Sequence, residues 1–574
     1  MGPKSSPFQK SGIYCWIDGE IYNRDNILNY FDYDSKSFSE LLIDAYSNNN
    51  LELVLSKIDG YFNAVLYTKS NLYLISDRYG MKPLYIWNNG NNFAWASELK
   101  AFLAFNSFKP TINENAITCF LNLGHLLGQI TWFKNVNMIK AATIVKYSIK
   151  KKKIINEKRY WKWSSIETQN IKFNEAVVKL GQLLKSAIKK RVKSDEKLGV
   201  SLSGGLDSRL ILSILDQIDD LDVVYFTYGI KGCDDINIAK TVSSIKENTH
   251  YIFEINKKNW LNEKFHQIWY SDGMVSFLHI HNPISLERLR ELFNIHLNGF
   301  AGDLIMGGSW IHNIDEKISK PVAIEKFGAQ IIFTNLNDDF FKISHEDPYF
   351  IDTRVRRFTN IAQIAYSRLV ETRKPFLDNK LIEFLYSISD KYRINSKLYK
   401  NTLLSEFPKY FKKIPWQKTE LPILRNKPFY IKIFKIIKKL LAKFSIIKSS
   451  KNYTNYDNWL RHPKLVKLAL KILNPKNAIY SKYINVDFIN QYLIPHIRKN
   501  NIFYRLLSMA KVILYSIKEY FVLKLCNKSH RSFMDILKNF DNSTKYTYDY
   551  SKKLGSILTM EIWFQQIFNK RYRS

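Results

Sequence analysis

The spacing of apolar residues divides the chain into an N-terminal region of short strands and a following region in which strands and helices alternate. From residue 12 to residue 103 the pattern is that of short strands and turns, and the β-rich run at 71–76 is its clearest strand. A hairpin is expected over residues 141–161, where apolar and polar residues alternate before the lysine-rich turn at 150–153. The mostly polar stretch at 164–170 predicts a linker.

The second region combines helical spacing with buried strands. Residues 173–192 carry apolar side chains at helical spacing, and a short strand at 198–202 precedes Ser-Gly-Gly and a helix with one apolar stripe. A buried strand follows at 222–228, and two strands separated by a helix of this length favour a parallel sheet. Residues 351–407 are expected to be mostly helical.

Length and composition place the chain among large globular proteins. Its 574 residues favour about three or four domains, and 46% hydrophobic with 24% charged residues excludes a mainly disordered chain and a collagen-like repeat. The four cysteines stand far apart without a CxxC pair, so neither structural zinc nor a disulfide framework is expected, and a reducing cytoplasm is favoured. Neither a secretory signal nor a membrane-spanning helix is expected, since no run reaches about 18 uncharged apolar residues.

The net charge of the chain is strongly positive. Lysine and arginine total 86 against 52 acidic residues, which gives +34, a field that attracts polyanions. The alternative explanation is an AT-rich genome, whose codons favour lysine at positions where any polar residue suffices. The spread of the excess lysine along the chain fits this alternative. Nucleic acid is not an expected partner, because no basic stretch carries regularly interleaved stacking aromatics.

One segment concentrates basic residues without acids. Residues 421–456 contain nine lysines and arginines, and residues 429–447 place apolar side chains at helical spacing between lysines. Such a helix either lies on an anionic membrane surface or packs on its own domain with its lysines in water, and the sequence leaves both interpretations open.

The SGGLDS segment at residues 203–208 has the features of a phosphate-binding loop. Its two glycines lie between a strand and a helix, where they let backbone N–H groups approach a ligand at the positive end of the helix. Both serine hydroxyls can donate to phosphate oxygens, and Asp207 is suited to hold a magnesium ion that bridges phosphates. The segment is not a Walker loop, because no GK[ST] follows, and a purely structural turn is the alternative.

SGGLDS looks like the pyrophosphate loop of the N-type ATP pyrophosphatases, and its surroundings resemble the asparagine synthetase family. Motifs of that family occur in its order over residues 12–424, and residues 551–571 look like its C-terminal helix. The segments that carry the resemblance in the synthetase half are Asn298–Asp303, Glu371–Asp378 and Pro415–Pro422. Those that resemble its class II glutaminase domain are Gly19–Asn23, Asp77–Tyr85 and Ala96–Lys100.

The resemblance implies an α/β fold of two main domains with additions. A degenerate Ntn-type αββα sandwich is expected over residues 1–165, and a parallel-sheet α/β ATP pyrophosphatase domain over 170–424. A basic, mostly helical insertion is expected over 425–550, and residues 551–574 would supply the C-terminal helix of the synthetase domain.

The resemblance also implies ATP-dependent formation of an amide: ATP adenylates a carboxylate with release of pyrophosphate, and an amine then attacks the acyl-adenylate. Asp207 and Asp303 would bind Mg²⁺. Lys418 would place a cation beside the reacting centre, although a solvated surface lysine is the alternative. The residues that the resemblance assigns to ATP and pyrophosphate binding are Leu202, Ser203, Gly204, Gly205, Asp207, Ser208, Tyr228, Gly299 and Gly302.

Three further residues of the matching segments keep two interpretations. Asp235 follows the buried strand at the point where the family lines its adenine pocket. Arg373 and Asp378 belong to the motif E-x-R-x-PFLD, and they fit an ion pair at a helix end equally well.

The glutaminase half departs from the family at its reactive positions. The family's nucleophile is a cysteine directly after the initiator methionine, where this sequence has Gly2, and Cys15 is not expected to replace it because it falls inside a strand pattern. The family's oxyanion asparagine is Asp18, and the acid of its TDxE motif is replaced within residues 37–40. Glutaminase activity is therefore not expected.

The synthetase half is altered in its second loop, where Phe300 and Leu304 replace two acids. In the family the first acid helps to handle the incoming amine, so Phe300 argues against free aspartate and ammonia and suits a larger or different acceptor. The expected partners are a small-molecule, peptide or sugar carboxylate and an amine donor. The sequence leaves open a tailoring ligase acting on a peptide or surface-polysaccharide acid, a non-catalytic member that binds nucleotide or an anionic surface, a homodimer, and peripheral contact of a cytoplasmic protein with an anionic membrane.

Overall fold

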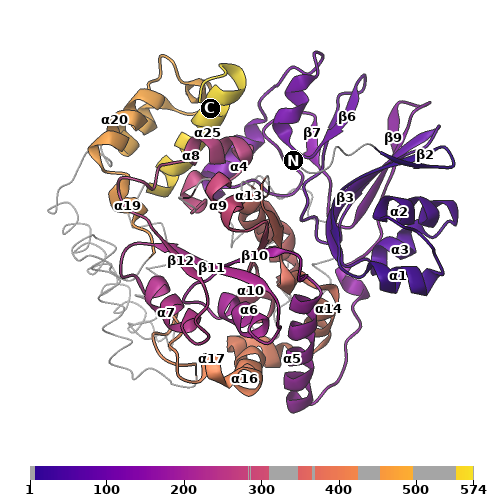
Figure 1. Ribbon diagram of the computed structural model, residues 1–574. Helices are drawn as coiled ribbons and strands as arrows, with labels where there is room; N and C mark the ends of the chain where they lie inside the picture. The colour runs from indigo at the N-terminus through magenta and orange to yellow at the C-terminus, as the bar shows by residue number, and fades with distance from the viewer. Residues whose placement is uncertain are drawn as a thin grey trace, which may run out of the picture.

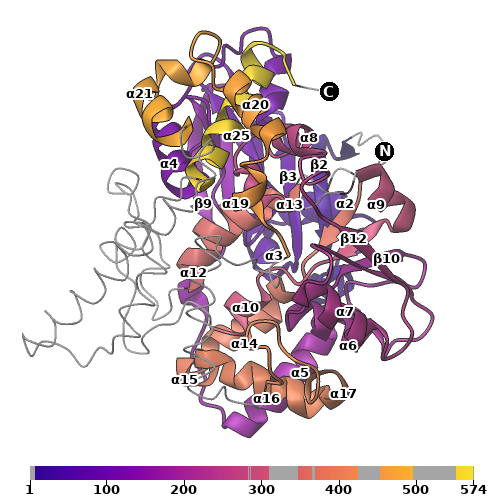
Figure 2. The same ribbon diagram turned by 90° about the vertical axis from the view of Figure 1, so that its left-hand side faces the viewer.

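The computed structural model describes residues 7–281, 286–308, 347–364, 369–423, 453–494 and 551–572, together with residues 284 and 367. Within these residues the chain forms three β-sheets and the helices that cover them (Figure 1). Figure 2 shows α20 (Pro463–Ile472), α21 (Val486–Phe488) and α25 (Ser551–Phe568) gathered at one end of the molecule, away from α5 (Phe173–Lys189) and α16 (Lys397–Glu406) at the other.

The N-terminal domain is built on a six-stranded antiparallel sheet. Its strands, in the order in which they pair, are β1 (Phe8–Lys10), β2 (Ile13–Ile21), β3 (Gly60–Tyr67), β4 (Asn71–Ser76), β8 (Thr143–Ser148) and β9 (Lys153–Arg159). The central strand β3 alternates strictly between the two faces, because Phe62, Ala64 and Leu66 pack on one side and Val65 on the other. Both faces of this sheet are therefore buried.

Helices cover one face of this sheet and a second sheet covers the other. The helices are α1 (Arg24–Phe31), α2 (Phe38–Ser47) and α3 (Leu51–Lys57), and the second sheet pairs β6 (Phe93–Ala96), β5 (Tyr85–Asn88) and β7 (Val136–Met138). Leu74, Ile86 and Val145 fill the space between the two sheets. The far side of the small sheet packs through Trp87 toward the 3₁₀ helix Leu99–Ala104 and α4 (Glu114–Leu123). These four layers confirm the expected αββα sandwich.

The second domain contains a five-stranded parallel sheet. Its strands lie in the order β12 (His250–Glu254), β11 (Asp222–Gly229), β10 (Lys197–Ser201), β13 (Ile295–Leu297) and β14 (Glu371–Arg373). The chain starts in the middle at β10, moves outward on one side through β11 and β12, and then returns to the other side of β10 with β13. This is the doubly wound arrangement, and it confirms the parallel-sheet α/β expectation.

Helices complete the second domain around the parallel sheet (Figure 1). The amphipathic helix α5 buries Val177, Leu180, Leu184 and Ile188 along one face. The other helices are α6 (Asp207–Leu215), α7 (Asp234–Ser243), α8 (Lys264–Tyr270), α9 (Leu286–Leu292), α10 (Gly302–Ile305), α12 (Asp347–Phe350), a π-helical segment (Ile351–Thr359), α13 (Asn360–Ile364), α14 (Asn379–Ser387), α15 (Asp390–Arg393), α16 (Lys397–Glu406) and α17 (Pro408–Phe411).

The C-terminal helix α25 (Ser551–Phe568) packs on both domains. The ring of Phe564 lies 5.4 Å from that of Trp132 in the first domain, and the ring of Trp563 lies 5.6 Å from that of Trp269 in the second. The short helices α19 (Tyr456–Trp459), α20 (Pro463–Ile472) and α21 (Val486–Phe488) lie near it (Figures 1 and 2). Helix α25 therefore joins the two domains at the end opposite to α5.

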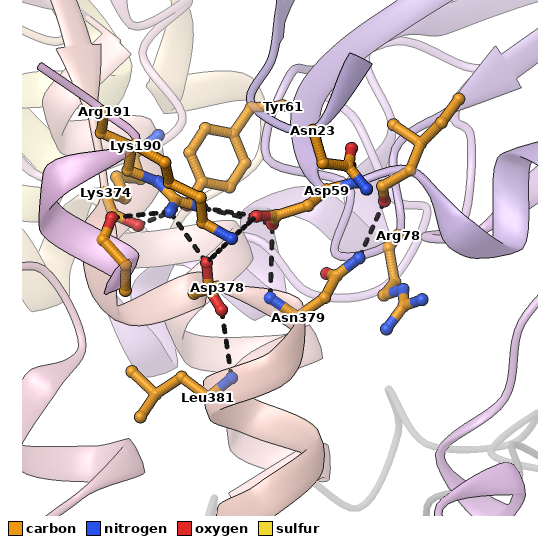
Figure 3. A network of polar contacts seen from close by, with 12 residues as sticks. Asn23, Asp59, Tyr61, Arg78, Lys190, Arg191, Lys374, Asp378, Asn379 and Leu381 are labelled. Atoms are coloured by element: carbon orange, nitrogen blue, oxygen red, sulfur yellow. Dashed lines mark hydrogen bonds and ion pairs between the residues drawn. The ribbon is translucent and has the colours of Figure 1, made fainter. Parts of the chain in front are cut away.

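A buried polar network joins the domains beside α5 (Figure 3). The guanidinium of Arg191, fully buried, donates to Asp378 Oδ2 at 2.9 Å and to Asp59 Oδ1 at 3.2 Å, and it lies 4.2 Å from the ring of Tyr22. Although burial opposes it, the charges of Arg191 and Lys190 lower the pKa of Asp378 to about 2. Asp378 also caps α14, so one carboxylate both starts a helix and anchors the interface.

A second polar network crosses the interface at β14. Arg373 donates to both carboxylate oxygens of Glu20 in the first domain, at 2.7 and 2.8 Å. It also donates two hydrogen bonds to the carboxylate of Glu196, beside β10. Such bidentate pairs are the strong form of the arginine–carboxylate contact. Burial and the neighbouring Glu20 raise the pKa of Glu371 to about 8. Glu20 and Glu371 therefore hold one proton between them near neutral pH.

Replacing Glu371 by glutamine is expected to make the protein more stable at pH 8 and to change little at pH 5. In the unfolded chain Glu371 ionises near pH 4.5, whereas in the fold it keeps its proton up to about pH 8, so stability falls as pH rises between these values. The measurement is the thermal midpoint of Glu371→Gln minus that of the wild type from pH 5 to 9, with the exposed Glu254→Gln as control. A difference that is flat or shrinks with pH would contradict the shared proton.

Most of the expected elements are confirmed, and the structure adds one strand. The strand at 71–76, the hairpin over 141–161, the helix from residue 173 and the strand from residue 222 all occur. The expectation of a mostly helical stretch over 351–407 is confirmed, and within it β14, which the sequence did not predict, joins the parallel sheet as a three-residue edge strand. The basic segment 429–447 and most of the expected insertion lie outside the described residues. Among the described helices, none is long and apolar enough to cross a membrane.

Candidate functional site

The candidate site lies where the strand order of the parallel sheet reverses. Strands β10 and β13 are adjacent and parallel, and the chain leaves them in opposite directions along the sheet. In doubly wound sheets the loops that follow the two strands at this point diverge and leave a crevice at their carboxyl ends. Here these loops are residues 203–208 and 298–303, the two segments that the sequence singled out.

The first loop is held by its own side chains and by α7. The N–H of Ser203 donates to Ser208 Oγ at 3.0 Å, and the N–H of Gly205 donates to Ser203 Oγ at 3.2 Å. The N–H of Gly204 donates to Asp235 Oδ1 at 2.9 Å. No side chain of the described residues caps the start of α6, so the positive end of that helix faces the loop. The loop is thus preformed around a helix terminus suited to an anion.

The two loops touch directly, and glycines make the contact feasible. A Cβ atom added at Gly302 would lie 2.5 Å from Cγ of Asp207, and one added at Gly299 would lie 3.2 Å from Asp207 Cβ. Any side chain at residue 302 would therefore displace Asp207. Both glycines serve to bring Asp303 close to Asp207.

Asp207 and Asp303 form the acidic centre of the site. Burial and the charge of Asp303 raise the pKa of Asp207 to about 7, against hydrogen bonds from the hydroxyl of Tyr399 and the N–H of Asp303. The hydroxyl of Tyr399, on α16, donates to Asp207 Oδ1 at 2.9 Å and fixes its orientation. No group of three or more His, Cys, Asp or Glu suited to a metal ion occurs among the described residues. Two carboxylates fit Mg²⁺, which keeps several waters and takes the rest of its oxygen ligands from phosphates.

The loop that carries Lys418 packs against the first loop through its backbone. The N–H of Gln417 donates to the carbonyl of Gly204 at 3.1 Å, and the buried Arg209 of α6 donates to the carbonyl of Pro415 at 2.7 Å. The Lys418 side chain is exposed, with its ammonium 5.3 Å from the ring of Trp416. The ammonium of Lys400, on α16, lies 5.5 Å from the same ring, so two cations flank Trp416.

The two remaining predicted binding residues occupy different surroundings. Leu202 is almost fully buried, its N–H donates to the carbonyl of Phe226, and its carbonyl accepts from Thr227, so it supports the loop from below. Tyr228 ends β11 beside Tyr453, whose carbonyl accepts from Ile230. Burial and the charge of Asp235 raise the pKa of Tyr228 to about 12.

The structure therefore gathers most of the predicted residues and adds others. It brings the two glycine-containing loops together and places the Lys418 loop against them, while Tyr228 lies at the next strand end. Sequence reasoning missed Tyr399, Arg209, Lys400 and Tyr453. No spacing signal could have found Tyr399, because it lies 192 residues from Asp207 in the chain. Arg373 forms an ion pair with Glu20 of the first domain, and Asp378 forms one with Arg191, which in turn binds Asp59 of the first domain, so both residues have the structural role.

A small cavity lies between the two domains, at the position of the altered glutaminase residues. It measures about 240 Å³ and is lined among others by Asp18, Glu20 and Lys374. Asp18 forms an ion pair of 3.0 Å with Lys82. Cys15 is 1% exposed, and burial raises the pKa of its thiol to about 12.

The segment that replaces TDxE has become a helix start. Ser37 caps α2 by accepting the N–H of Glu40 at 3.1 Å, and Glu40 in turn accepts the N–H of Lys36 at 2.7 Å. Together they form a capping arrangement in which serine and glutamate satisfy orphan amides. Phe38 packs edge-on against the ring of Phe62, 5.0 Å away, so it serves the core.

Phe300, which replaces an acid of the second loop, points into the protein. Its side chain is 3% exposed, and the ammonium of Lys374 lies 5.4 Å from its ring. Lys374 also lines the small cavity between the two domains. Phe300 and Lys374 therefore fill the space between that cavity and the second loop.

Comparisons with known proteins agree with this two-part organisation. A family model described as a glutamine amidotransferase domain matches residues 4–161, and one described as asparagine synthase matches residues 179–340. A Methanocaldococcus jannaschii chain that carries an asparagine synthetase name is 25% identical over 320 residues, which are 54% of this chain and 61% of the relative. Asparagine synthetase [glutamine-hydrolyzing] 3 of Bacillus subtilis is 23% identical over 480 residues, 72% of this chain and 77% of the relative.

Other relatives match over shorter regions. The asparagine synthetase of Mus musculus is 28% identical over 257 residues, which are 42% of this chain and 43% of the relative. The match thus spans less than two thirds of the length of the methanogen and mouse relatives. Among solved structures, glutamine phosphoribosylpyrophosphate amidotransferase from B. subtilis is 10% identical with a TM-score of 0.19, over 43% of this chain and 47% of that one. That score is too low to carry an argument.

Proposed function

We propose that the chain is an ATP-dependent ligase of the asparagine synthetase kind, which joins a carboxylate to an amine through an acyl-adenylate; the similarity of its two halves to the two matching family models supports this. The single observation that carries the proposal is the contact between the two glycine-containing loops at the strand-order reversal, where Asp207 and Asp303 converge. The start of α6, which no side chain of the described residues caps, lies beside this pair of carboxylates.

The reaction would proceed in two balanced steps. A carboxylate oxygen of the substrate attacks the α-phosphorus of ATP, the bond to the β-phosphate breaks, and pyrophosphate leaves. The amine nitrogen then attacks the acyl carbon, AMP leaves, and the nitrogen loses a proton. Each step moves negative charge onto a departing phosphate, which fixed positive groups stabilise.

The residues of the site match these requirements. Asp207 and Asp303 would hold Mg²⁺, which supplies positive charge beside the phosphates. The start of α6 and the hydroxyls of Ser203 and Ser208 would bind the pyrophosphate. Lys418 would place its ammonium beside the acyl-phosphate centre, since its loop is bonded to Gly204. Tyr399 orients Asp207 for these contacts.

The acceptor is proposed to be a carboxylate other than free aspartate. Phe300 and Leu304 stand where the family has acids, and both are buried, so neither meets the incoming amine with a charge. Phe300 and Lys374 also fill the space toward the first domain, which supports an amine that arrives from solution or belongs to the substrate.

The test is pyrophosphate release by the full chain with ATP and Mg²⁺. Aspartate with ammonia is offered against a panel of other carboxylates with amines, and a mixture without carboxylate serves as control. Pyrophosphate release that occurs with one class of carboxylate, and not in the mixture without carboxylate, supports the proposal and identifies the substrate class. Silence with every carboxylate would favour a protein that only binds nucleotide.

We expect no hydrolysis of glutamine by this chain. Asp18 places a carboxylate where an oxyanion would form, and the Cys15 thiol is buried with its pKa raised to about 12, so neither group serves a thiolate mechanism. The measurement is glutamate formed from glutamine, with and without ATP, against a sample lacking protein. Glutamate formed well above that blank would reveal a nucleophile elsewhere in the chain and would contradict the expectation.

A further inference from the structure

A groove of about 970 Å³ lies between the two domains, on the side of α1, α5 and α14. Its wall in the first domain comes from α1, the end of α3 and the chain after β9, and its wall in the second comes from α5 and the start of α14. None of its lining residues belongs to the loops at 203–208 or 298–303 or to the Lys418 loop. The groove is therefore separate from the proposed catalytic site, and its volume falls in the range of small-molecule sites.

The lining of the groove is strongly basic. It includes two acidic side chains, Asp59 and Glu383. Asp59 is neutralised by Arg191, and Glu383 forms an ion pair with Arg78 of 2.5 Å. The basic side chains of the lining are Lys57, Arg78, Arg159, Lys162, Lys190 and Lys380. The groove thus carries a surplus of four positive charges, contributed by both domains.

Aromatic rings orient two of these cations. The ammonium of Lys57 lies 4.3 Å from the centre of the Tyr30 ring, and the guanidinium of Arg78 lies 4.8 Å from that of Trp161. Lys57, Lys162 and Lys380 form no ion pair with any residue that the structure describes. Contacts with aromatic faces orient a cation and leave its charge available to an anion.

One buried donor of the lining has no partner. Arg78 is 5% exposed, and although its terminal nitrogens bind Glu383 and the carbonyl of Ser56, its Nε has no hydrogen-bond acceptor among the described residues. Figure 3 shows Arg78 across from Asn379 and beside the Asp59 network, so the arginine belongs to the wall formed where the domains meet. Arg78 thus keeps one buried donor that no described residue satisfies, in the wall where the two domains meet.

We propose that this groove binds a small, multiply charged anion whose phosphate or carboxylate oxygens bridge the two domains. Cations of both walls face the same space, so an anion with several charged groups would contact Lys57 and Lys162 on one side and Lys380 on the other. Single oxyanions would gain little from exposed lysines, whereas several charges held together gain from all of them at once. Binding would hold the two domains in their present arrangement.

The test uses the full chain with saturating MgATP, so that the proposed nucleotide site is occupied. Binding of inorganic tripolyphosphate and, separately, of citrate is measured by calorimetry for the wild type and for Lys162→Glu/Lys380→Glu. Both residues are exposed, one lies in each domain, and their charge reversal leaves the core intact. The control is Lys109→Glu/Lys257→Glu, which changes the net charge equally at exposed positions outside the groove.

We expect at least one of the two anions to bind the wild type. We expect the affinity for that anion to fall at least tenfold in the groove variant and less than twofold in the control. Addition of the anion should raise the thermal midpoint of the wild type and of the control, but not that of the groove variant. Dependence on the groove for tripolyphosphate alone identifies a phosphate ligand, and for citrate alone a carboxylate ligand. Equal losses in both variants, or no binding of either anion by the wild type, would overturn the proposal.

Discussion

Replacing Asp207 by alanine is expected to lower ATP-dependent pyrophosphate release by about 10³-fold or more. Asp207 starts α6, faces Asp303, and accepts a hydrogen bond from Tyr399, so it lies where the first loop, the second loop and α16 meet. Its loss would leave Asp303 as the one carboxylate for Mg²⁺ at this contact. The rate of pyrophosphate release under saturating ATP measures the effect.

Two further variants separate this chemistry from folding. Asp207→Asn keeps the shape of the side chain and removes its charge, and it is expected to lose activity to a similar degree while keeping the thermal midpoint of the wild type. Asp219→Ala, at an exposed position in the same domain, should leave the rate unchanged within about twofold. Undiminished turnover of Asp207→Asn would remove this carboxylate from the mechanism.

Replacing Arg191 by methionine is expected to lower the free energy of unfolding by about 3–5 kcal/mol, because breaking a buried ion pair leaves its partners uncompensated. The Arg191 side chain is fully buried and pairs with Asp59 of one domain and Asp378 of the other, as Figure 3 shows. Without it, two carboxylates face each other with Lys190 as the remaining cation of the network. The first thermal or urea-induced transition of the full chain measures the loss.

A compensating change makes this expectation specific. Asp59→Asn added to Arg191→Met should recover part of the lost stability, because it removes one of the two uncompensated charges. The control is Arg288→Met, which breaks an exposed pair with Glu291 on α9 and should change stability by less than about 1 kcal/mol. A stability of Arg191→Met equal to that of this control would show that the network does not hold the domains.

The parts of the fold that the sequence predicts are those set by local spacing. Helix α5 buries its apolar residues at the expected periodicity, and the runs of β-forming residues at 71–76 and from residue 222 are strands, as predicted. The loop at 203–208 was found because its glycines and serines follow a strand directly, which is a short-range signal.

Other features depend on contacts that no short window contains. Strand β14 has three residues, too few for a periodic signal, and it forms because β13 offers a free edge beside it. The small sheet of β5, β6 and β7 likewise pairs segments about 50 residues apart. The role of Tyr399 beside Asp207 depends on the packing of α16, which the helical pattern of that segment does not specify.

The residues of the E-x-R-x-PFLD motif illustrate the same limit. Sequence reasoning left Arg373 and Asp378 between a catalytic site and an ion pair, and the structure engages both at the domain interface. The deciding partner of Arg373 is Glu20, 353 residues away in the chain, and that of Asp378 is Arg191, 187 residues away. Long-range partners of this kind are invisible to spacing arguments, however clear the motif.

The most direct test of the proposed ligase activity is the identity of the phosphorus products when the full chain turns over ATP with Mg²⁺ and an accepted carboxylate. We expect AMP and pyrophosphate in equal amounts, because the carboxylate oxygen attacks the α-phosphorus at the loop of residues 203–208. In a sample with ¹⁸O-labelled carboxylate, one labelled oxygen should appear in AMP once the amide has formed. Formation of ADP and phosphate, or AMP without label, would contradict adenylation at this site.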